Sequence, residues 1–216
     1  MVVARRSAAL PERVVESVDD SRLHIRMGRP DDAPAILAIY EPFVRMTAVT
    51  FEYAVPAVAE MAERVRTVTA RWPWLVLERG DRVAGYAYAS TWRARAAYQW
   101  AVETTVYVHP DARWRGVGRA LYRSLLACLR LQGHRMALGA ITLPNAASVA
   151  LHEALGFGCT GVHRACGYKL GAWHDVGMWE LELAPRDDVD PPDPSSPGRL
   201  EGTPEWAAAL ASGLGR

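Results

Sequence analysis

The stretch at residues 102–122, VETTVYVHPDARWRGVGRALY, indicates how the fold is organised. Its first seven residues have the pattern of a strand, a turn follows at His109 and Pro110, and a helix begins near Gly116. Two features are unusual. Glu103 interrupts an otherwise uncharged strand, although strands disfavour glutamate. Three arginines and two glycines also stand where the helix begins.

The basic loop has the spacing Arg-x-x-Gly-x-Gly, with Arg113, Gly116 and Gly118 directly before the predicted helix. Glycine tolerates a positive φ and lets the backbone approach a ligand closely. A helix N-terminus favours phosphate groups through its free N–H groups and dipole, and Arg115 and Arg119 add positive charge. The pattern predicts a pyrophosphate site, although an ordinary strand-to-helix turn fits it equally well. It matches neither the Walker A loop nor the dinucleotide fingerprint.

A second polar segment, LPNAASVALHEALGF at residues 143–157, follows a predicted strand and contains a predicted helix. Asn145 and Ser148 stand at the start of this helix, and His152 lies one turn beyond Ser148. These residues are the second candidates for ligand binding. Structural roles fit them as well, with Asn145 and Ser148 as capping groups and His152 as a partly buried helix residue.

Composition limits the function classes. The chain has 216 residues, half of them hydrophobic, and a formal net charge of +1, which gives no support to a general polyanion-binding role. The cysteines Cys128, Cys159 and Cys166 lack metal-site spacing and fit reduced thiols in a cytosolic protein. No apolar run approaches the ~18 residues of a membrane span, and no signal-peptide pattern opens the chain. We expect a cytoplasmic protein with no metal, nucleic-acid or membrane partner.

Changes of composition predict one packed domain at residues 22–185 with an appendage at each end. Residues 1–21 are expected to form a flexible N-terminal extension. Residues 186–216 are rich in Pro, Asp and Ser and have little to bury, so we expect a flexible tail with at most a brief helix at residues 206–210.

Inside the domain, periodicity and turn residues predict the order β-α-α-β-β-β-α-β-α-β-β. A mixed order with crossover helices predicts an α/β fold in which a mixed central sheet is flanked by helices. The strands are expected at residues 23–27, 74–79, 82–90, 102–108, 136–142, 162–168 and 176–183.

Together the basic loop and the Asn…Gly-Phe segment resemble the GCN5-related N-acetyltransferase family, in which they match the pyrophosphate signature and the second cofactor arm. The element order fits that fold. Residues 71–108, 143–157 and 167–179 look like phosphinothricin N-acetyltransferases and their methionine-sulfoximine-acetylating relatives. The resemblance covers about residues 23–183.

The resemblance implies that acetyl-CoA is the cosubstrate. The strand that carries VYV would bond the pantetheine arm and the thioester carbonyl through its backbone, which is electrostatic stabilisation by fixed N–H groups. The implied cofactor-binding residues are Val106, Tyr107, Val108, Arg113, Trp114, Arg115, Gly116, Val117, Gly118, Arg119, Asn145 and Ser148.

The resemblance also implies catalytic roles for Glu103 and His152. An amine is mostly ammonium at pH 7 and needs a base before it attacks. Glu103 is the implied base, and by strand alternation it faces away from Val102 and Thr104; a solvated residue on an exposed face is the alternative. His152 stands where many family members have tyrosine, so it is either the acid for the leaving thiolate or part of the channel wall. Tyr107 is a weaker candidate for the acid.

An anionic, amino-acid-like substrate favours arginine, whose planar fork matches oxyanions. Arg93 and Arg95, shortly before the strand of Glu103, are the candidates, with Phe51 as a pocket residue and Lys169 and His174 as further possibilities. Solvated loop positions explain the arginines equally well.

We therefore expect an N-acetyltransferase that acts on the α-amine of a small substrate such as phosphinothricin or methionine sulfoximine, and that forms a homodimer as its relatives commonly do. One alternative keeps the fold but acetylates a protein N-terminus or a polyamine. Another is a non-catalytic CoA-binding module, which would retain the glycine loop without a base.

Overall fold

The computed structural model describes residues 23–112, 116–186 and 190–215. The expected N-terminal extension at residues 1–21 lies outside these ranges, and so do Arg113, Trp114 and Arg115 of the basic loop. The predicted α/β fold and its order of strands and helices are confirmed within the described domain.

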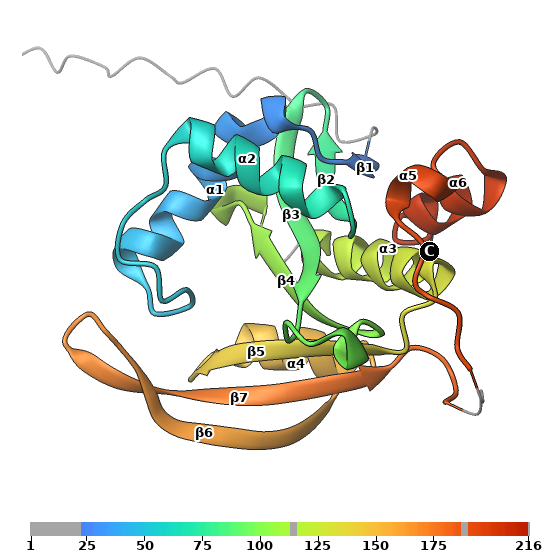
Figure 1. Cartoon of the computed structure of the whole chain (residues 1–216). Helices are drawn as coiled ribbons and strands as arrows, with labels where there is room; N and C mark the ends of the chain where they lie inside the picture. Colours follow the sequence, from blue (N-terminus) through green and yellow to red (C-terminus); the bar gives the residue numbers. More distant parts are fainter. Residues whose placement is uncertain (1–22, 113–115, 187–189, 216) are drawn as a thin grey trace, which may run out of the picture.

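The sheet has the spatial order β1-β2-β3-β4-β5-β7-β6 (Figure 1). All neighbours run antiparallel except β4 and β5, which are parallel. The strands are β1 Leu23–Met27, β2 Trp74–Arg79, β3 Arg82–Thr91, β4 Ala101–Val108, β5 Met136–Leu143, β6 Gly158–Lys169 and β7 Ala172–Glu182.

Helices cover both faces of the sheet, with α1 and α2 on one face and α3 and α4 on the other (Figure 1). The helices are α1 Ala33–Met46, α2 Val58–Thr69, α3 Val117–Gln132, α4 Ala146–Ala154, α5 Pro197–Leu200 and α6 Pro204–Ala211. Alternate side chains of a strand point to opposite faces, so Val76 of β2 packs with α1 and α2 whereas Leu75 and Leu77 pack with α3. Because both faces of β2 are buried over residues 74–77, its sequence is a continuous apolar run there and does not alternate with polar residues.

The parallel strands β4 and β5 pair only at one end. Residues 101–103 pair with residues 136–138, after which β4 continues along β3 and β5 continues along β7. The two strands therefore separate and leave a gap in the middle of the sheet.

Strands β6 and β7 form a hairpin that is longer than predicted. The strands expected at residues 162–168 and 176–183 begin at Gly158 and Ala172. β6 is an edge strand whose side chains are mostly exposed, so its ends show no hydrophobic alternation. The turn uses Leu170 and Gly171, whose φ angles of 52° and 81° are both positive, as a type I′ hairpin turn requires.

The C-terminal segment is folded over residues 190–215, which corrects the expectation of a flexible tail at residues 186–216. Helices α5 and α6 lie beside α3 (Figure 1), and the brief helix expected at residues 206–210 is part of α6. Trp206 is 2% exposed and packs against Cys128 of α3. Ser124 of α3 donates a hydrogen bond of 2.7 Å to the Leu210 carbonyl. The prediction was based on the polar average composition of this segment. A single buried tryptophan is enough to dock it, because this side chain removes a large area from water.

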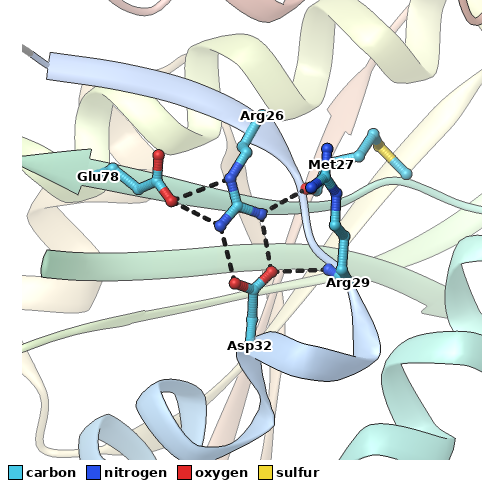
Figure 2. Close-up of polar contacts among 5 residues, drawn as sticks. All are labelled: Arg26, Met27, Arg29, Asp32 and Glu78. Carbon is cyan, nitrogen blue, oxygen red and sulfur yellow. Dashed lines mark hydrogen bonds and ion pairs between the residues drawn. The ribbon is translucent and has the colours of Figure 1, made fainter. Parts of the chain in front are cut away.

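Arg26 ties the first strand to its neighbours (Figure 2). Its guanidinium donates to Glu78 of β2 and, through two bonds of 2.8 Å, to Asp32 at the start of α1. Asp32 also accepts a bond of 2.7 Å from the backbone N–H of Arg29. One arginine thus holds two carboxylates and fixes where the chain enters α1.

Candidate active site

A cavity of about 300 Å³ lies where β4 and β5 separate. β4 contributes residues 103–107 to its wall, and the connection between α1 and α2 contributes residues 49–52. Four further polar side chains border it: Tyr122 of α3, Ser148 and His152 of α4, and Asn145, which directly precedes α4.

Glu103 borders this cavity from β4. Its neighbour Val102 is fully buried against the α3 face, so the alternation predicted for this strand is present. Burial raises the pKa of the Glu103 carboxyl above its ordinary value, and no described residue offers the carboxylate a hydrogen bond or an ion pair. A carboxylate in this state is more basic than a solvated one, which suits it to accept a proton near neutral pH.

Tyr122 of α3 is a cavity residue that our reading of the sequence missed. Its hydroxyl lies 3.0 Å from Nε2 of His152 and 3.2 Å from the carbonyl oxygen of Thr104, where β4 leaves β5. In a regular helical pattern such a tyrosine is indistinguishable from a core residue. The available signal was its spacing, because Tyr122 lies four residues after Gly118 and so shares its helix face.

The surroundings of His152 make it a neutral, orienting group. Its Nδ1 lies 2.8 Å from the Ser148 carbonyl, which can only accept, so this nitrogen carries the proton. Burial lowers the pKa of His152, which leaves Nε2 as an acceptor for the Tyr122 hydroxyl at pH 7. Burial also raises the pKa of Tyr122 well above its ordinary value, so the phenol keeps its proton.

The open edge of β4 presents backbone groups to the gap. The His109 N–H donates to the Ala84 carbonyl on the β3 side at 2.9 Å. Because backbone groups alternate along a strand, the N–H groups of Val106 and Val108 face the opposite side, toward the gap. Tyr107 between them packs edge-on against Tyr40, with ring centroids 5.0 Å apart.

The N-terminus of α3 adds a second set of free N–H groups. Gly116 precedes the helix with a φ of 78°, a left-handed conformation that favours glycine. The first helical bond joins the Ala120 N–H to the Gly116 carbonyl, so the N–H groups of Val117, Gly118 and Arg119 have no partner within the helix.

Asn145 has the capping role that the sequence left open. Its Oδ1 accepts a hydrogen bond of 3.1 Å from the Ser148 N–H and so caps α4. Asn145 and Ser148 also border the cavity, so their part in the helix cap is compatible with ligand binding.

Only one of the three predicted substrate-binding residues borders the cavity. Phe51 borders the cavity. Arg93 and Arg95 are exposed on the connection between β3 and β4 and do not border it, because this connection runs over the surface as most loops do. Lys169 and His174 of the hairpin do not border it either.

The cavity wall carries acidic charge. Its carboxylates are Glu52, which Arg64 neutralises through bonds of 2.6 and 3.2 Å, and the unpaired Glu103. No Lys or Arg among the described residues borders the cavity. The described residues also contain no cluster of three His, Cys, Asp or Glu side chains that could hold a metal. None of their helices is long and apolar enough to cross a membrane.

Comparison with protein families matches residues 25–179 to the acetyltransferase (GNAT) domain. The phosphinothricin N-acetyltransferase of Streptomyces viridochromogenes is 40% identical over 161 residues, which are 74% of this chain and 88% of that protein. The L-methionine sulfoximine/L-methionine sulfone acetyltransferase of Pseudomonas paraeruginosa is 37% identical over 160 residues, 71% of this chain and 91% of that protein.

Comparison with solved structures also finds the fold of GNAT acetyltransferases. The GNAT superfamily phosphinothricin acetyltransferase of Sinorhizobium meliloti, in complex with acetyl-CoA, superposes with a TM-score of 0.76 at 36% identity. That match covers 81% of this chain and 96% of the other. The family model and these relatives span the strands and helices that build the cavity, and the chain therefore belongs to the GNAT acetyltransferase family.

Proposed function

We propose that this enzyme transfers the acetyl group of acetyl-CoA to the α-amine of a small amino-acid-like substrate such as phosphinothricin or methionine sulfoximine. One observation carries the proposal. Glu103 is an unpaired carboxylate of raised pKa in a cavity beside an open strand edge and a helix N-terminus. Similarity to acetyltransferases with these two substrates in their names supports the substrate class.

The residues present fit acetyl-CoA. The free N–H groups at the start of α3 would hold the pyrophosphate, and the basic loop would add the charge of Arg113 and Arg115. The open backbone of Val106 and Val108 would bond the pantetheine arm and polarise the thioester carbonyl. Once bound, acetyl-CoA supplies an activated acyl group as a thioester.

In the proposed mechanism Glu103 takes the proton that the substrate amine must lose, directly or through a water molecule. The N–H groups of the β4 edge stabilise the negative charge that develops on the carbonyl oxygen. Before the reaction the Tyr122 hydroxyl donates its single proton to Nε2 of His152; in the proposed step the hydroxyl turns this proton toward the departing sulfur instead. The resemblance implied His152 as the acid. In the proposed mechanism Tyr122 is the donor instead, and His152 orients it.

A substrate with anionic groups needs a cation, and the described cavity wall holds no Lys or Arg. Arg93 and Arg95 remain our candidates for this contact, because they follow Ser90, which pairs with Glu103 across the sheet. The unpaired Glu103 also favours one rival, a polyamine acceptor, whose cationic groups a carboxylate without a basic partner would attract.

We also propose a cytoplasmic homodimer. The tip of the hairpin exposes large apolar side chains, since Tyr168, Leu170 and Trp173 are 47%, 60% and 66% exposed. Among the described strands, none pairs with the outer edge of β6, and such edges are usually covered. The three cysteines, all free, fit a reducing compartment. Light scattering with the wild type and Trp173→Ala tests the assembly, and a monomeric wild type would refute the dimer.

The substrate proposal is tested by acetyl-CoA-dependent thiol release with phosphinothricin, methionine sulfoximine, glutamate, spermidine and a short peptide. We expect the two glutamate analogues to have the highest kcat/KM. Arg95→Ala should lower it about ten- to a hundredfold for phosphinothricin, since a bidentate charged contact is lost, and less for an uncharged amine. A higher efficiency with spermidine or the peptide would refute the small-substrate proposal. Equal losses for charged and uncharged amines would refute only the arginine contact.

A further inference from the structure

The tip of the β6–β7 hairpin rests on a segment that closes the cavity. Residues 49–52, which we call the roof segment, border the cavity from the connection between α1 and α2. Figure 1 shows this connection reaching toward the hairpin tip, and three contacts join the two. None of these contacts has a role in the mechanism above.

The first contact is made by Lys169. It is the only lysine in the sequence, and the other basic residues among the 25 Lys and Arg are all arginines. Lys169 is 2% exposed, and its ammonium donates a hydrogen bond of 2.7 Å to the backbone carbonyl of Thr50. The hydroxyl of Thr50 bonds to Tyr40 of α1, also at 2.7 Å, so the roof segment is held from two sides. A compact ammonium can fill this enclosed place, whereas a guanidinium requires a planar fork of partners.

The second contact joins Gly167 to the ring of Phe51. A Cβ at position 167 would lie 2.1–2.7 Å from three atoms of this ring, which is far inside van der Waals contact. Phe51 also borders the cavity. Phe51 can therefore occupy its place beside the cavity only because residue 167 is glycine.

The hairpin is built to hold both positions. Gly167 and Lys169 are two residues apart in β6, so they share a face, whereas Tyr168 between them is 47% exposed. The third contact uses only the backbone of Tyr168, whose carbonyl accepts a hydrogen bond from the Tyr53 hydroxyl. His174 pairs with Gly167 across the hairpin, and its Nε2 donates to the Lys169 carbonyl at 3.0 Å.

We propose that Gly167 and Lys169 are positioning residues that set the shape of the acceptor cavity, and so its choice of substrate, through the roof segment. The inference rests on the proposed function and deepens it, because it assigns acceptor specificity to two positions outside the cavity wall.

The first test substitutes Gly167. Gly167→Ala should push Phe51 into the cavity, raise KM for methionine sulfoximine at least about fivefold and leave KM for acetyl-CoA within about twofold. Gly161→Ala is the matched control, since a Cβ at this other β6 glycine meets nothing within 4 Å. In a Phe51→Ala background the Gly167→Ala change should have no further effect, because the displaced ring is gone. Equal losses with and without the Phe51 ring would overturn the proposal.

The second test substitutes Lys169. Lys169→Met should raise KM for methionine sulfoximine more than it lowers kcat, and Lys169→Gln should recover part of the loss because its amide can still donate to Thr50. Wild-type kinetics in both variants would overturn the role. A uniform loss that also raises KM for acetyl-CoA would show a purely structural residue and would equally overturn it.

A third measurement needs no acceptor. An amine-reactive ester followed by peptide mass spectrometry reports on Lys169 as the one lysine side chain of the sequence, with an added lysine-containing peptide as the freely reacting reference. We expect slow labelling in the wild type and in Gly161→Ala, and faster labelling in Gly167→Ala. Rapid labelling in the wild type would overturn the proposal. If the wild type acetylated no methionine sulfoximine while Lys169 stayed protected, the proposed acceptor would fail and the positioning role would stand.

Discussion

At the scale of single residues, two glutamates in one cavity have different properties because their neighbours differ. Arg64 pairs with Glu52 through two hydrogen bonds, whereas Glu103 has no partner in the described chain and burial raises the pKa of its carboxyl. Environments that separate two carboxylates in this way commonly mark which of them takes part in proton transfer. Leaving Glu103 unpaired lowers stability, and in the proposed mechanism it keeps a base available.

Glu103→Gln tests this assignment. General-base catalysis typically contributes about 10²–10⁴-fold, so kcat should fall by that order while the affinity for acetyl-CoA stays near that of the wild type. The wild-type kcat/KM should rise with pH through an apparent pKa above 4.5, and this limb should vanish in the variant. The melting temperature should rise at neutral pH, because the variant no longer buries an unpaired charge.

Glu52→Gln is the matched control, because it removes a paired carboxylate from the same wall. It should retain the pH limb. A change in kcat of less than about threefold in Glu103→Gln would make Glu103 a structural residue, since no general base acts so weakly.

At the scale of elements, the parting of β4 from β5 and the start of α3 create the site together. Three paired positions hold the strands, and the separation beyond them opens a backbone edge beside the free N–H groups of a helix. Both sets of free groups are N–H donors, which cannot satisfy one another, so an acceptor ligand or water must pair with them.

Gly118→Val tests the helix start. A Cβ at position 118 would sit 3.4 Å from Leu151 and 3.5 Å from Val108, so a methyl group fits while the two further carbons of valine crowd the gap. We expect calorimetry to show strongly weakened acetyl-CoA binding for Gly118→Val and a much smaller loss for Gly118→Ala, with both proteins folded. Unchanged affinity in folded Gly118→Val would remove this part of the cofactor site.

The ion-pair cluster of Figure 2 predicts how stability depends on pH. Burial by itself would raise the pKa of Asp32, but the hydrogen bonds from Arg26 and from the Arg29 backbone outweigh it, and the pKa is lowered. The stabilisation is therefore present above the unfolded-state pKa of about 3.9 and is lost as pH falls through the lower folded-state value. Asp32→Asn should lower the melting temperature at pH 7, and this difference should shrink toward pH 3. Asp31→Asn, at an exposed neighbouring position, should show neither effect.

At the scale of the whole molecule, the C-terminal helices extend the core beyond the residues that match the family. The family model ends at residue 179, whereas α6 packs its tryptophan against α3, the helix that starts at the proposed cofactor site. The close approach of Gly213 to α3, where a Cβ would overlap the Ala120 carbonyl, shows how tightly the segment is seated. The extension thus supports the outer side of α3.

Trp206→Ala should cost about 3–5 kcal/mol of unfolding free energy, as large-to-small changes of fully buried aromatic residues do. Met46→Ala is the control, because that side chain is large, apolar and 70% exposed. Chemical denaturation of both variants measures the difference. Equal stability of Trp206→Ala and the wild type would mean that the extension adds nothing to the core.

The sequence by itself determined the order of strands and helices, because apolar periodicity and turn residues act over short distances along the chain. It also indicated Glu103 and the glycine loop, since a carboxylate in an uncharged strand and glycines at a helix start conflict with local preference. The membership of Tyr122 in the site, the distance of Arg93 from the cavity and the docking of Trp206 had no local signal. These were decided only by the tertiary structure, because they depend on which segments, far apart along the chain, the sheet and its gap bring into contact.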